Sequence, residues 1–328
     1  MTRWSFSSTG NEVVSTFKDR VEGKTILITG PSTGGIGAQT ALTLSSGNPS
    51  HLILTGRSLP KIQPVITAIN EAHPSVKTTF IPCDLASQAS VRAAANEINA
   101  LVEKIDILIC NAAIMACPYV KTEDGIESQF ATNHLGHFLL VNLLKGKLVA
   151  EGSGMGTRVV VVVVGSSAYA HGGVRFKDWN FEDGKTYNEW EAYGQSKTAN
   201  MLFAKALARK MERSGGFAFS LNPGSIRSNL QVHMLSNEAI LADGLARMTA
   251  SEAKEGRAFV RAPQKTLEQG CATALIAALD PELEPFSGEY LDDGDVSKVK
   301  VREYATSLEI QEKLWKLSEE LVGEEFAW

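Results

Sequence analysis

The hydrophobic positions of this chain fall into short β-branched runs that alternate with longer segments of helical periodicity. The runs predict strands at Thr25–Thr29, His51–Thr55, Thr78–Ile81, Asp106–Cys110, Arg158–Val164 and Phe217–Leu221. The longer segments predict helices at Gly35–Ser46, Lys61–Ala72, Gln88–Val102, Glu127–Leu144 and Ala192–Arg213. Strands that alternate with helices indicate a parallel sheet that is covered on both faces.

The fifth predicted strand ends in an unbroken run of valines, Val159–Val164, which is typical of a strand buried on both faces. The run is far shorter than the roughly 18 apolar residues of a membrane span. We interpret the preceding segment Ala150–Gly156, rich in small residues, as a loop. Because the alternation continues across it, we predict a single Rossmann-like domain over residues 1–328. This domain would be a doubly wound α/β/α sandwich with a parallel sheet of about seven strands.

The two ends of the chain lie outside the alternating pattern. Residues 1–23 precede the first strand and are predicted to form an N-terminal extension with an amphipathic helix. Residues 308–323 place leucines at helical spacing and predict a C-terminal helix. The segment Met1–Gly10 lacks the pattern of a secretory signal.

Composition narrows the class of function. Of the 328 residues 44% are hydrophobic and 21% are charged, as in an ordinary globular enzyme, and the net charge of −5 does not indicate a nucleic-acid binder. The four cysteines (Cys83, Cys110, Cys117 and Cys271) form no CxxC pair, which argues against a zinc site. We therefore expect no metal, reduced thiols and a cytoplasmic location.

A glycine-rich stretch joins the first predicted strand to the first predicted helix. It reads Thr29-Gly30-Pro31-Ser32-Thr33-Gly34-Gly35-Ile36-Gly37. Glycine lets the backbone approach a pyrophosphate closely, and the helix N-terminus that follows supplies free N–H groups and the positive end of a dipole. In a strand-turn-helix context, the stretch predicts a dinucleotide site. We expect its contacts to come from Gly30, Ser32, Thr33, Gly35, Ile36 and Gly37.

The residues after the second strand indicate which dinucleotide would bind. A carboxylate there would bind the 2′-hydroxyl of NAD, whereas an arginine would accommodate the 2′-phosphate of NADP. The segment His51–Ser58 contains no Asp or Glu, and Arg57 lies just past the strand. A guanidinium matches a phosphate in geometry and charge. We predict NADP(H) as the cofactor; the alternative is that Arg57 is a solvated surface residue.

Tyr193 and Lys197 are spaced i, i+4 in a predicted helix, which puts both side chains on one face. A free phenol has a pKa of about 10 and is a poor acid or base at neutral pH. A nearby ammonium would favour the phenolate and lower that pKa. The tyrosine could then give a proton to a carbonyl oxygen that receives a hydride, or take one from an alcohol. This spacing is common by chance, so other motifs have to support the chemistry.

Several motifs occur together and in one order. They are the glycine-rich turn, Asn111-Ala112-Ala113, Asn133-His134-Leu135-Gly136-His137, the Ser166 region, Tyr193–Lys197 and Asn222-Pro223-Gly224. In this order they make the chain resemble the short-chain dehydrogenase/reductase family, most closely the NADP(H)-dependent branch that includes retinol dehydrogenases. The resemblance covers nearly the whole chain. It departs from the family pattern at Gly34-Gly35, where an additional residue leaves two glycines as candidates for the middle position.

The resemblance implies a role for each of four polar residues. Tyr193 would be the general acid/base, and Lys197 would lower its pKa and hold the nicotinamide ribose. Asn133 would position a water that links Lys197 to bulk solvent. Ser166 would hydrogen-bond the reacting oxygen, with the adjacent Ser167 as the alternative.

Further cofactor contacts are expected after the third, fourth and sixth strands. Asp84 and Leu85 would lie near the adenine, and the small residues at Asn111, Ala112 and Ala113 would let the cofactor pass close to the sheet. The resemblance also implies the turn Pro223-Gly224, with Ile226 and Ser228 facing the nicotinamide carboxamide.

Two further segments bear on the substrate. Residues 229–262 correspond to the segment that covers the substrate in the family, and their apolar residues favour a hydrophobic substrate; the alternative is an amphipathic helix pair packed on the core. Five aromatic residues precede Tyr193 and either wall the substrate pocket or pack a loop. They are Phe176, Trp179, Phe181, Tyr187 and Trp190.

The sequence therefore predicts an oxidoreductase that interconverts a ketone or aldehyde and an alcohol with NADP(H). Its partner would be a small molecule, with no nucleic acid and no transmembrane segment. One alternative is a non-catalytic NADP(H)-binding regulatory or scaffold protein. Another keeps the fold but reduces double bonds or dehydrates its substrate. The identity of the substrate and the choice between monomer and homo-oligomer are left open.

Overall fold

One sheet of eight strands, in the order β10-β9-β6-β5-β4-β1-β2-β3, forms the centre of the molecule. Its six long central strands are parallel: β1 (Thr25–Thr29), β2 (His51–Gly56), β3 (Lys77–Pro82), β4 (Ile107–Cys110), β5 (Val159–Val164) and β6 (Gly216–Asn222). β9 (Tyr290–Asp292) continues the parallel order beside β6, and β10 (Asp295–Val296) returns antiparallel to it. The computed structural model describes residues 3–148 and 158–328, so the predicted loop Ala150–Gly156 lies outside the described residues.

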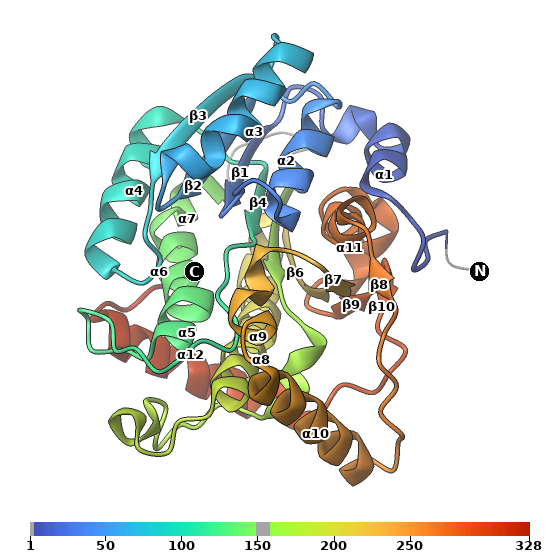
Figure 1. The fold of residues 1–328 in the computed structure, drawn as a ribbon. Coiled ribbons are helices and arrows are strands. Elements are labelled where there is room, and N and C mark those ends of the chain that lie inside the picture. The colour runs from blue at the N-terminus through green and yellow to red at the C-terminus, as the bar shows by residue number, and fades with distance from the viewer. Residues whose placement is uncertain (1–2, 149–157) are drawn as a thin grey trace.

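Helices cover both faces of this sheet (Figure 1). One layer contains α1 (Gly10–Thr16), α2 (Ile36–Ser45), α3 (Leu59–Ala72) and α11 (Leu267–Leu279). The other contains α4 (Gln88–Leu101), α6 (Gly136–Leu143), α8 (Glu189–Met211) and α12 (Leu308–Val322). The predicted doubly wound α/β/α sandwich is confirmed. None of the helices in the described residues is long and apolar enough to cross a membrane.

The alternation of side chains along the strands builds two separate cores. In β1, Leu27 packs on the α4–α6–α8 side, whereas Ile26 and Ile28 pack on the α2–α11 side. The valines of β5 alternate in the same way, and Val159–Val163 have no exposed surface. Successive side chains of a strand point to opposite faces, so a strand covered on both faces has to be apolar throughout.

The C-terminal part of the sheet differs from the prediction. The strands β9 and β10 form a short hairpin whose turn contains Asp293 (φ +50°) and Gly294 (φ +82°), a conformation typical of tight hairpins. The acidic residues Asp292, Asp293 and Asp295 all belong to this hairpin. Strands this short carry too little periodicity to be recognised, and the buried helix α11 was also not predicted. The sheet has eight strands where about seven were expected.

Two predicted helices also differ in detail. In its described residues 3–23 the N-terminal extension forms the short helix α1, followed by a 3-10 turn at Lys18–Arg20. The predicted helix Glu127–Leu144 is divided into α5 (Ser128–Phe130), a π-helical turn at Ala131–Leu135 and α6. π-turns are rare and are frequent at functional sites. This one contains Asn133.

Candidate active site

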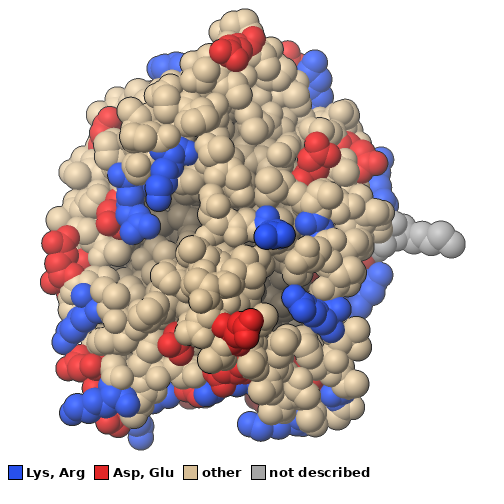
Figure 2. Space-filling model, in the orientation of Figure 1, with Lys and Arg blue, Asp and Glu red and all other residues tan. Residues whose placement is uncertain are grey.

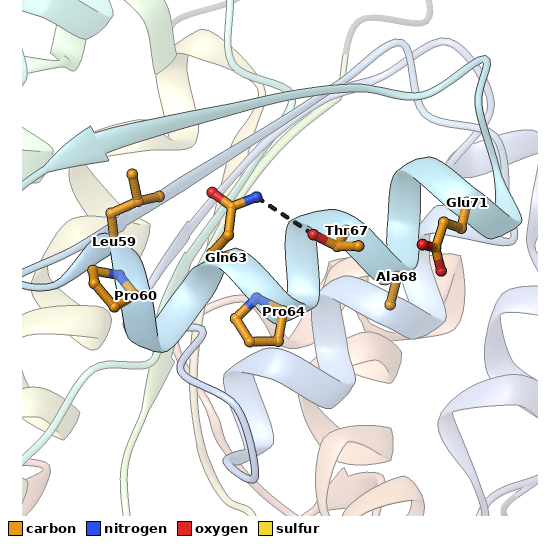
Figure 3. Close-up of a pocket in the computed structure, with 7 residues that line it drawn as sticks. All are labelled: Leu59, Pro60, Gln63, Pro64, Thr67, Ala68 and Glu71. Atoms are coloured by element: carbon orange, nitrogen blue, oxygen red, sulfur yellow. Dashed lines mark hydrogen bonds between the residues drawn. The ribbon is translucent and has the colours of Figure 1, made fainter.

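The predicted site residues follow the carboxyl ends of the parallel strands, which meet at one edge of the sheet. The structure places Gly30 after β1, Arg57 after β2, Asp84 after β3, Asn111 after β4 and Ser166 after β5. Two surface pockets lie elsewhere. One is an open groove along the face of α3 from Leu59 to Glu71 (Figure 3), and the other lies around Arg20, Asp106 and Glu284. Neither is lined by a predicted site residue.

Gly30 brings the glycine-rich turn into direct contact with the end of β4. Its φ of +66° lies in the left-handed region, and a Cβ at this position would be 2.7 Å from the Cβ of Ala112. A Cβ at Gly37 would lie 2.3 Å from Nδ2 of Asn111. The backbone can approach its neighbours this closely only with glycine at these positions.

The two adjacent glycines of the turn have different conformations. Gly34 has a φ of +77°, whereas Gly35 is extended and forms the N-cap of α2 without a side-chain cap. The first backbone N–H groups of a helix have no partner within the helix, so those of Ile36 and Gly37 are suited to bind an anion. Thr33 differs, because its N–H and its hydroxyl both donate to the carbonyl of Lys61.

Asn111 has an architectural role that the sequence did not indicate. Its Nδ2 donates to the carbonyls of Thr29 (2.9 Å) and Gly30 (3.3 Å). The hydroxyl of Thr29 in turn accepts the backbone N–H groups of Asn111 (2.9 Å) and Ala112 (3.0 Å). These bonds hold the turn after β1 against the loop after β4. A dinucleotide on the turn would therefore lie on a fixed backbone.

We expect Gly30→Ala to destabilise the fold and weaken dinucleotide binding together. A matched control is Gly23→Ala, since Gly23 has a similar φ of +71° but a Cβ there would meet nothing within 4 Å. The left-handed conformation costs alanine about 1–2 kcal/mol at either position. Gly30→Ala adds the collision with Ala112, so its urea midpoint should fall further. Equal losses of stability in the two variants, with unchanged NADPH affinity, would contradict the claim that glycine is needed at position 30 for the close approach to Ala112.

Arg57 is exposed immediately after β2, and within the described residues none of the ion pairs involves it. Lys and Arg side chains border a hollow on the face drawn in Figure 2. Asp84 is tied into its own loop, because its Oδ1 accepts the N–H of Ala86 at 3.0 Å. Leu85 packs against α6, where a Cβ at Gly136 would lie 2.3 Å from the Leu85 carbonyl oxygen.

Tyr193 and Lys197 lie together on α8, as the spacing predicts. Both are nearly inaccessible, with 3% and 2% of their surfaces exposed, and the ammonium lies 5.6 Å from the centre of the phenol ring. Nζ of Lys197 donates to the carbonyl of Val164 at 2.9 Å. Burial raises the pKa of Tyr193 and lowers the pKa of Lys197 to about 7, because a low-dielectric environment disfavours either charged form.

The expected lowering of the Tyr193 pKa by Lys197 is therefore not found in this structure. Desolvation has the larger effect, and a hydrogen bond from Ser166 opposes it by favouring the phenolate. The raised pKa favours the protonated phenol over the phenolate.

The structure distinguishes the two adjacent serines. Ser166 is partly buried, its side chain lowers the pKa of the Tyr193 phenol, and its Oγ accepts the N–H of Ala168 at 3.1 Å. Ser167 is exposed, and its backbone N–H donates to Oδ1 of Asn222 at 3.3 Å. Ser166 is therefore the serine that shares a site with Tyr193.

Asn133 is completely buried in the π-turn. Its Oδ1 accepts the N–H of Ile114, and its Nδ2 donates to the carbonyl of Ile114 and to Oγ of Ser196, each at 2.9 Å. These side-chain bonds hold the loop after β4 and the helix α8. Because the side chain is engaged in these bonds, the proposed water-positioning role would fall to other atoms of Asn133, such as its carbonyl.

The Pro223-Gly224 turn leads into a small second sheet. β7 (Ser225–Ile226) pairs in parallel with β8 (Gln264–Lys265), and Gly224 has a φ of +93°. Ile226 is buried against Gly270 of α11, close to Ile36 at the start of α2. Ser228 caps the 3-10 turn that follows by accepting the N–H of Leu230. Ile226 is thus placed beside the glycine-rich turn.

Residues 229–262 form α9 (Val232–Leu235) and α10 (Glu238–Lys254), which extend over the carboxyl-end side of the body (Figure 1). The segment begins at the glycine-rich turn, because Nδ2 of Asn229 donates to the carbonyl of Thr33 at 2.9 Å. The sequence did not indicate this contact. The 229–262 segment also contacts Trp190, whose Nε1 donates to the carbonyl of Ile240 at 2.6 Å.

An apolar cluster surrounds Tyr193. Its buried members are Met115, Ala116, Ala168, Trp190 and Tyr193, and Leu230, Met234 and Ile240 of the 229–262 segment pack against it. The five aromatic residues that precede Tyr193 were expected either to wall the substrate pocket or to pack a loop, and they do not all behave alike. Trp190 is 6.2 Å from Tyr193 between ring centres, whereas Phe176 and Trp179 pack on the core beneath α8 and α12. Trp190 alone of the five belongs to the Tyr193 cluster.

Comparison with known proteins supports the same assignment. Residues 24–177 match the family described as short chain dehydrogenase. The chain is 34% identical over 316 residues to human retinol dehydrogenase 14, and the alignment covers 92% of this chain and 87% of that protein. It is 37% identical over 309 residues to human retinol dehydrogenase 13, covering 93% and 86%. With the Brassica napus chloroplastic short-chain dehydrogenase TIC 32 A it shares 35% identity over 303 residues, covering 91% and 88%.

Solved structures agree with the fold. An uncharacterized protein from Mycobacterium paratuberculosis superposes with a TM-score of 0.69 at 29% identity, covering 94% of this chain and 96% of that one. A short chain dehydrogenase from Escherichia coli in complex with NADPH has a TM-score of 0.58 at 19% identity, covering 84% and 98%. The order of motifs, the Tyr193–Lys197 geometry and these relatives lead to one conclusion. The chain is an oxidoreductase that belongs to the short-chain dehydrogenase/reductase family.

Proposed function

We propose that the protein is an NADPH-dependent reductase of hydrophobic ketones or aldehydes, with Tyr193 as the proton donor. The observation that carries this proposal is the buried phenol of Tyr193 beside Ser166, inside an apolar cluster that raises its pKa and so favours its protonated form. A protonated donor favours reduction over oxidation, because the new alcohol oxygen needs a proton. Relatives named retinol dehydrogenases support an apolar substrate.

The residues at the carboxyl edge are suited to hold NADP(H). The pyrophosphate would lie on the N–H groups of Ile36 and Gly37, next to the close approach of Gly30 and Ala112. Arg57 would bind the 2′-phosphate, and Lys197 would bind the nicotinamide ribose. When bound, NADPH supplies the hydride. The NADPH complex of the Escherichia coli structure supports this cofactor on the same fold.

The chain's own residues would then do three things. Ser166 orients the carbonyl oxygen of the substrate, and Tyr193 protonates that oxygen as charge develops on it. The apolar cluster excludes water, which strengthens both interactions. The four cysteines are free thiols, which fits the cytoplasmic location that we propose.

NADPH oxidation with a panel of carbonyl compounds tests the function. We expect bulky apolar ketones and aldehydes to be reduced with higher kcat/KM than small polar sugars, because the cluster around Tyr193 offers few polar partners. NADPH binding without turnover of any carbonyl would instead support the non-catalytic alternative. Turnover of activated double bonds alone would support the second alternative.

Arg57→Glu tests the cofactor. The change removes a cation from the expected 2′-phosphate site and adds a repelling carboxylate, so the Kd for NADPH should rise by about 30-fold or more while that for NADH changes little. Arg213→Glu is a matched control, because Arg213 is also exposed but lies beyond α8, at the opposite edge of the sheet. If both variants weaken NADPH binding equally, or if neither does, Arg57 does not bind the 2′-phosphate.

A further inference from the structure

A buried histidine, His137, lies between the glycine-rich turn and the helix that holds Tyr193. It belongs to α6 and has 1% of its surface exposed, and both of its ring nitrogens have hydrogen-bond partners. Nε2 is 2.8 Å from the hydroxyl of Thr29, the last residue of β1, and Nδ1 is 3.0 Å from the carbonyl oxygen of Asn133. His137 therefore bridges the sheet and the π-turn.

The partners of His137 define the direction of each hydrogen bond. The Thr29 oxygen already accepts two backbone N–H groups, from Asn111 and Ala112, which use both of its lone pairs. Its own hydrogen is therefore donated to Nε2 of His137. The carbonyl of Asn133 accepts, so Nδ1 carries the ring hydrogen. The ring is the neutral Nδ1–H tautomer, and burial lowers the pKa of His137 to about 4, which keeps it neutral.

The hydrogen bonds continue from Asn133 to the catalytic helix. Nδ2 of Asn133 donates to Oγ of Ser196 at 2.9 Å, and Oγ of Ser196 donates to the carbonyl of Tyr193 at 2.8 Å. Asn133 and Ser196 have no exposed surface. Buried networks of this kind are rigid when every member is satisfied. One continuous path thus joins the end of β1 to the backbone of Tyr193.

We propose that His137 is a positioning residue that fixes Tyr193 relative to the dinucleotide turn, by accepting from Thr29 on one side and donating to Asn133 on the other. The path begins at Thr29, whose hydroxyl holds the glycine-rich turn against the loop after β4. It ends on Tyr193, the proposed proton donor. Rate depends steeply on the placement of reacting groups, so a small shift along this path lowers kcat. The kinetic part of the inference rests on the proposed function.

The chain offers a matched control on the same helical segment. His134 has no exposed surface either, but its Nε2 pairs with Oγ of Ser318 in α12, away from the turn. Loss of either histidine removes buried hydrogen bonds and lowers stability. Only loss of His137 interrupts the path to Tyr193.

The experiment compares His137→Phe with His134→Phe at a temperature well below both unfolding midpoints. We expect His137→Phe to lower kcat about 10-fold with little change in the KM of the carbonyl substrate. It should also raise the Kd for NADPH about threefold, the cost of one ordinary hydrogen bond. His134→Phe should lower the unfolding midpoint but leave kcat and Kd unchanged. His137→Asn, which can still donate to Asn133, should recover part of kcat.

A second measurement needs neither activity nor a folded variant. Nitrogen NMR of the wild-type protein should show His137 as the Nδ1–H tautomer, without titration between pH 8 and 5. An Nε2–H tautomer or an ordinary histidine titration would overturn the inference, as would equal effects of the two phenylalanine variants on kcat and Kd. If the wild type reduces no carbonyl compound, the proposed function fails, while the NMR and Kd measurements still decide the role of His137.

Discussion

Replacing Tyr193 with phenylalanine is expected to lower kcat for carbonyl reduction by about 10² to 10⁴, the usual contribution of a positioned general acid. The variant keeps the ring and its packing against Trp190, but the hydroxyl that we propose as the proton donor is lost. Because hydride acceptance without a proton leaves charge on the oxygen, the loss falls on the chemical step. The KM for the carbonyl and the Kd for NADPH should change much less. Steady-state kinetics and fluorescence titration with NADPH measure these quantities.

Tyr290→Phe is the matched control for this prediction. Its hydroxyl is also buried but has no hydrogen-bond partner in the described structure, so its removal deletes the same atom without breaking a bond. We expect unchanged kcat and no loss of stability. If Tyr193→Phe retained more than about a tenth of the wild-type kcat, the general-acid assignment would be wrong. Equal losses in both variants would indicate a packing effect near the site.

Replacing Lys197 with methionine is expected to lower activity and to raise the stability of the folded state. The ammonium is 2% exposed and has one described hydrogen-bond partner, the carbonyl of Val164. Without Nζ the nicotinamide ribose loses its proposed ligand, so the Kd for NADPH should rise and kcat should fall, together by about 10²-fold in kcat/KM. Methionine fills a similar volume without charge, and Val164 still accepts from Nδ2 of Asn200. The folded state should therefore become more stable at pH 6.

The pH dependence of that gain follows from the pKa of Lys197. Folding lowers it from 10.5 to about 7, so between these values the unfolded chain binds more protons than the folded protein. The contribution of Lys197 to the free energy of unfolding of the wild type therefore rises with pH across that window. The difference in urea midpoint between Lys197→Met and wild type should be largest below pH 7 and shrink towards pH 10. A difference that is independent of pH would contradict the buried, desolvated ammonium.

The sequence predicts the central part of this structure well. The valines of β5 and the strand-turn-helix context of Gly30 are strong local signals, and the spacing of Tyr193 and Lys197 places them together on α8 as predicted. Short elements are different, because β7 to β10 contain two or three residues each and have no period to detect. β7, β8 and β9 are held by pairing with strands that are distant in sequence, and β10 is held by its hairpin with β9.

The parts of the site that were not predicted depend on contacts between distant segments. Nothing in the local sequence shows that Asn229 reaches the carbonyl of Thr33, or that Asn111 binds the backbone of Gly30. The prediction that the pKa of Tyr193 would be lowered was wrong for the same reason. A neighbouring lysine can be inferred from spacing, but the degree of burial that outweighs it requires the packed structure.

The 17-residue helix α10 is joined to the body in an unusual way, since Gly244 is its one buried residue among those described. It is tied to the body through the Trp190 indole, the ion pair of Arg247 with Glu191 and the hydrogen bond from Asn188 to Asp243, while the pair of Arg247 with Asp243 lies within the helix. The two hydrophobic cores therefore gain little from the sequence of α10. Substitutions on α10 should therefore cost little folding stability, so the surface of the segment that is expected to cover the substrate can change without disturbing the framework that holds Tyr193 and Lys197.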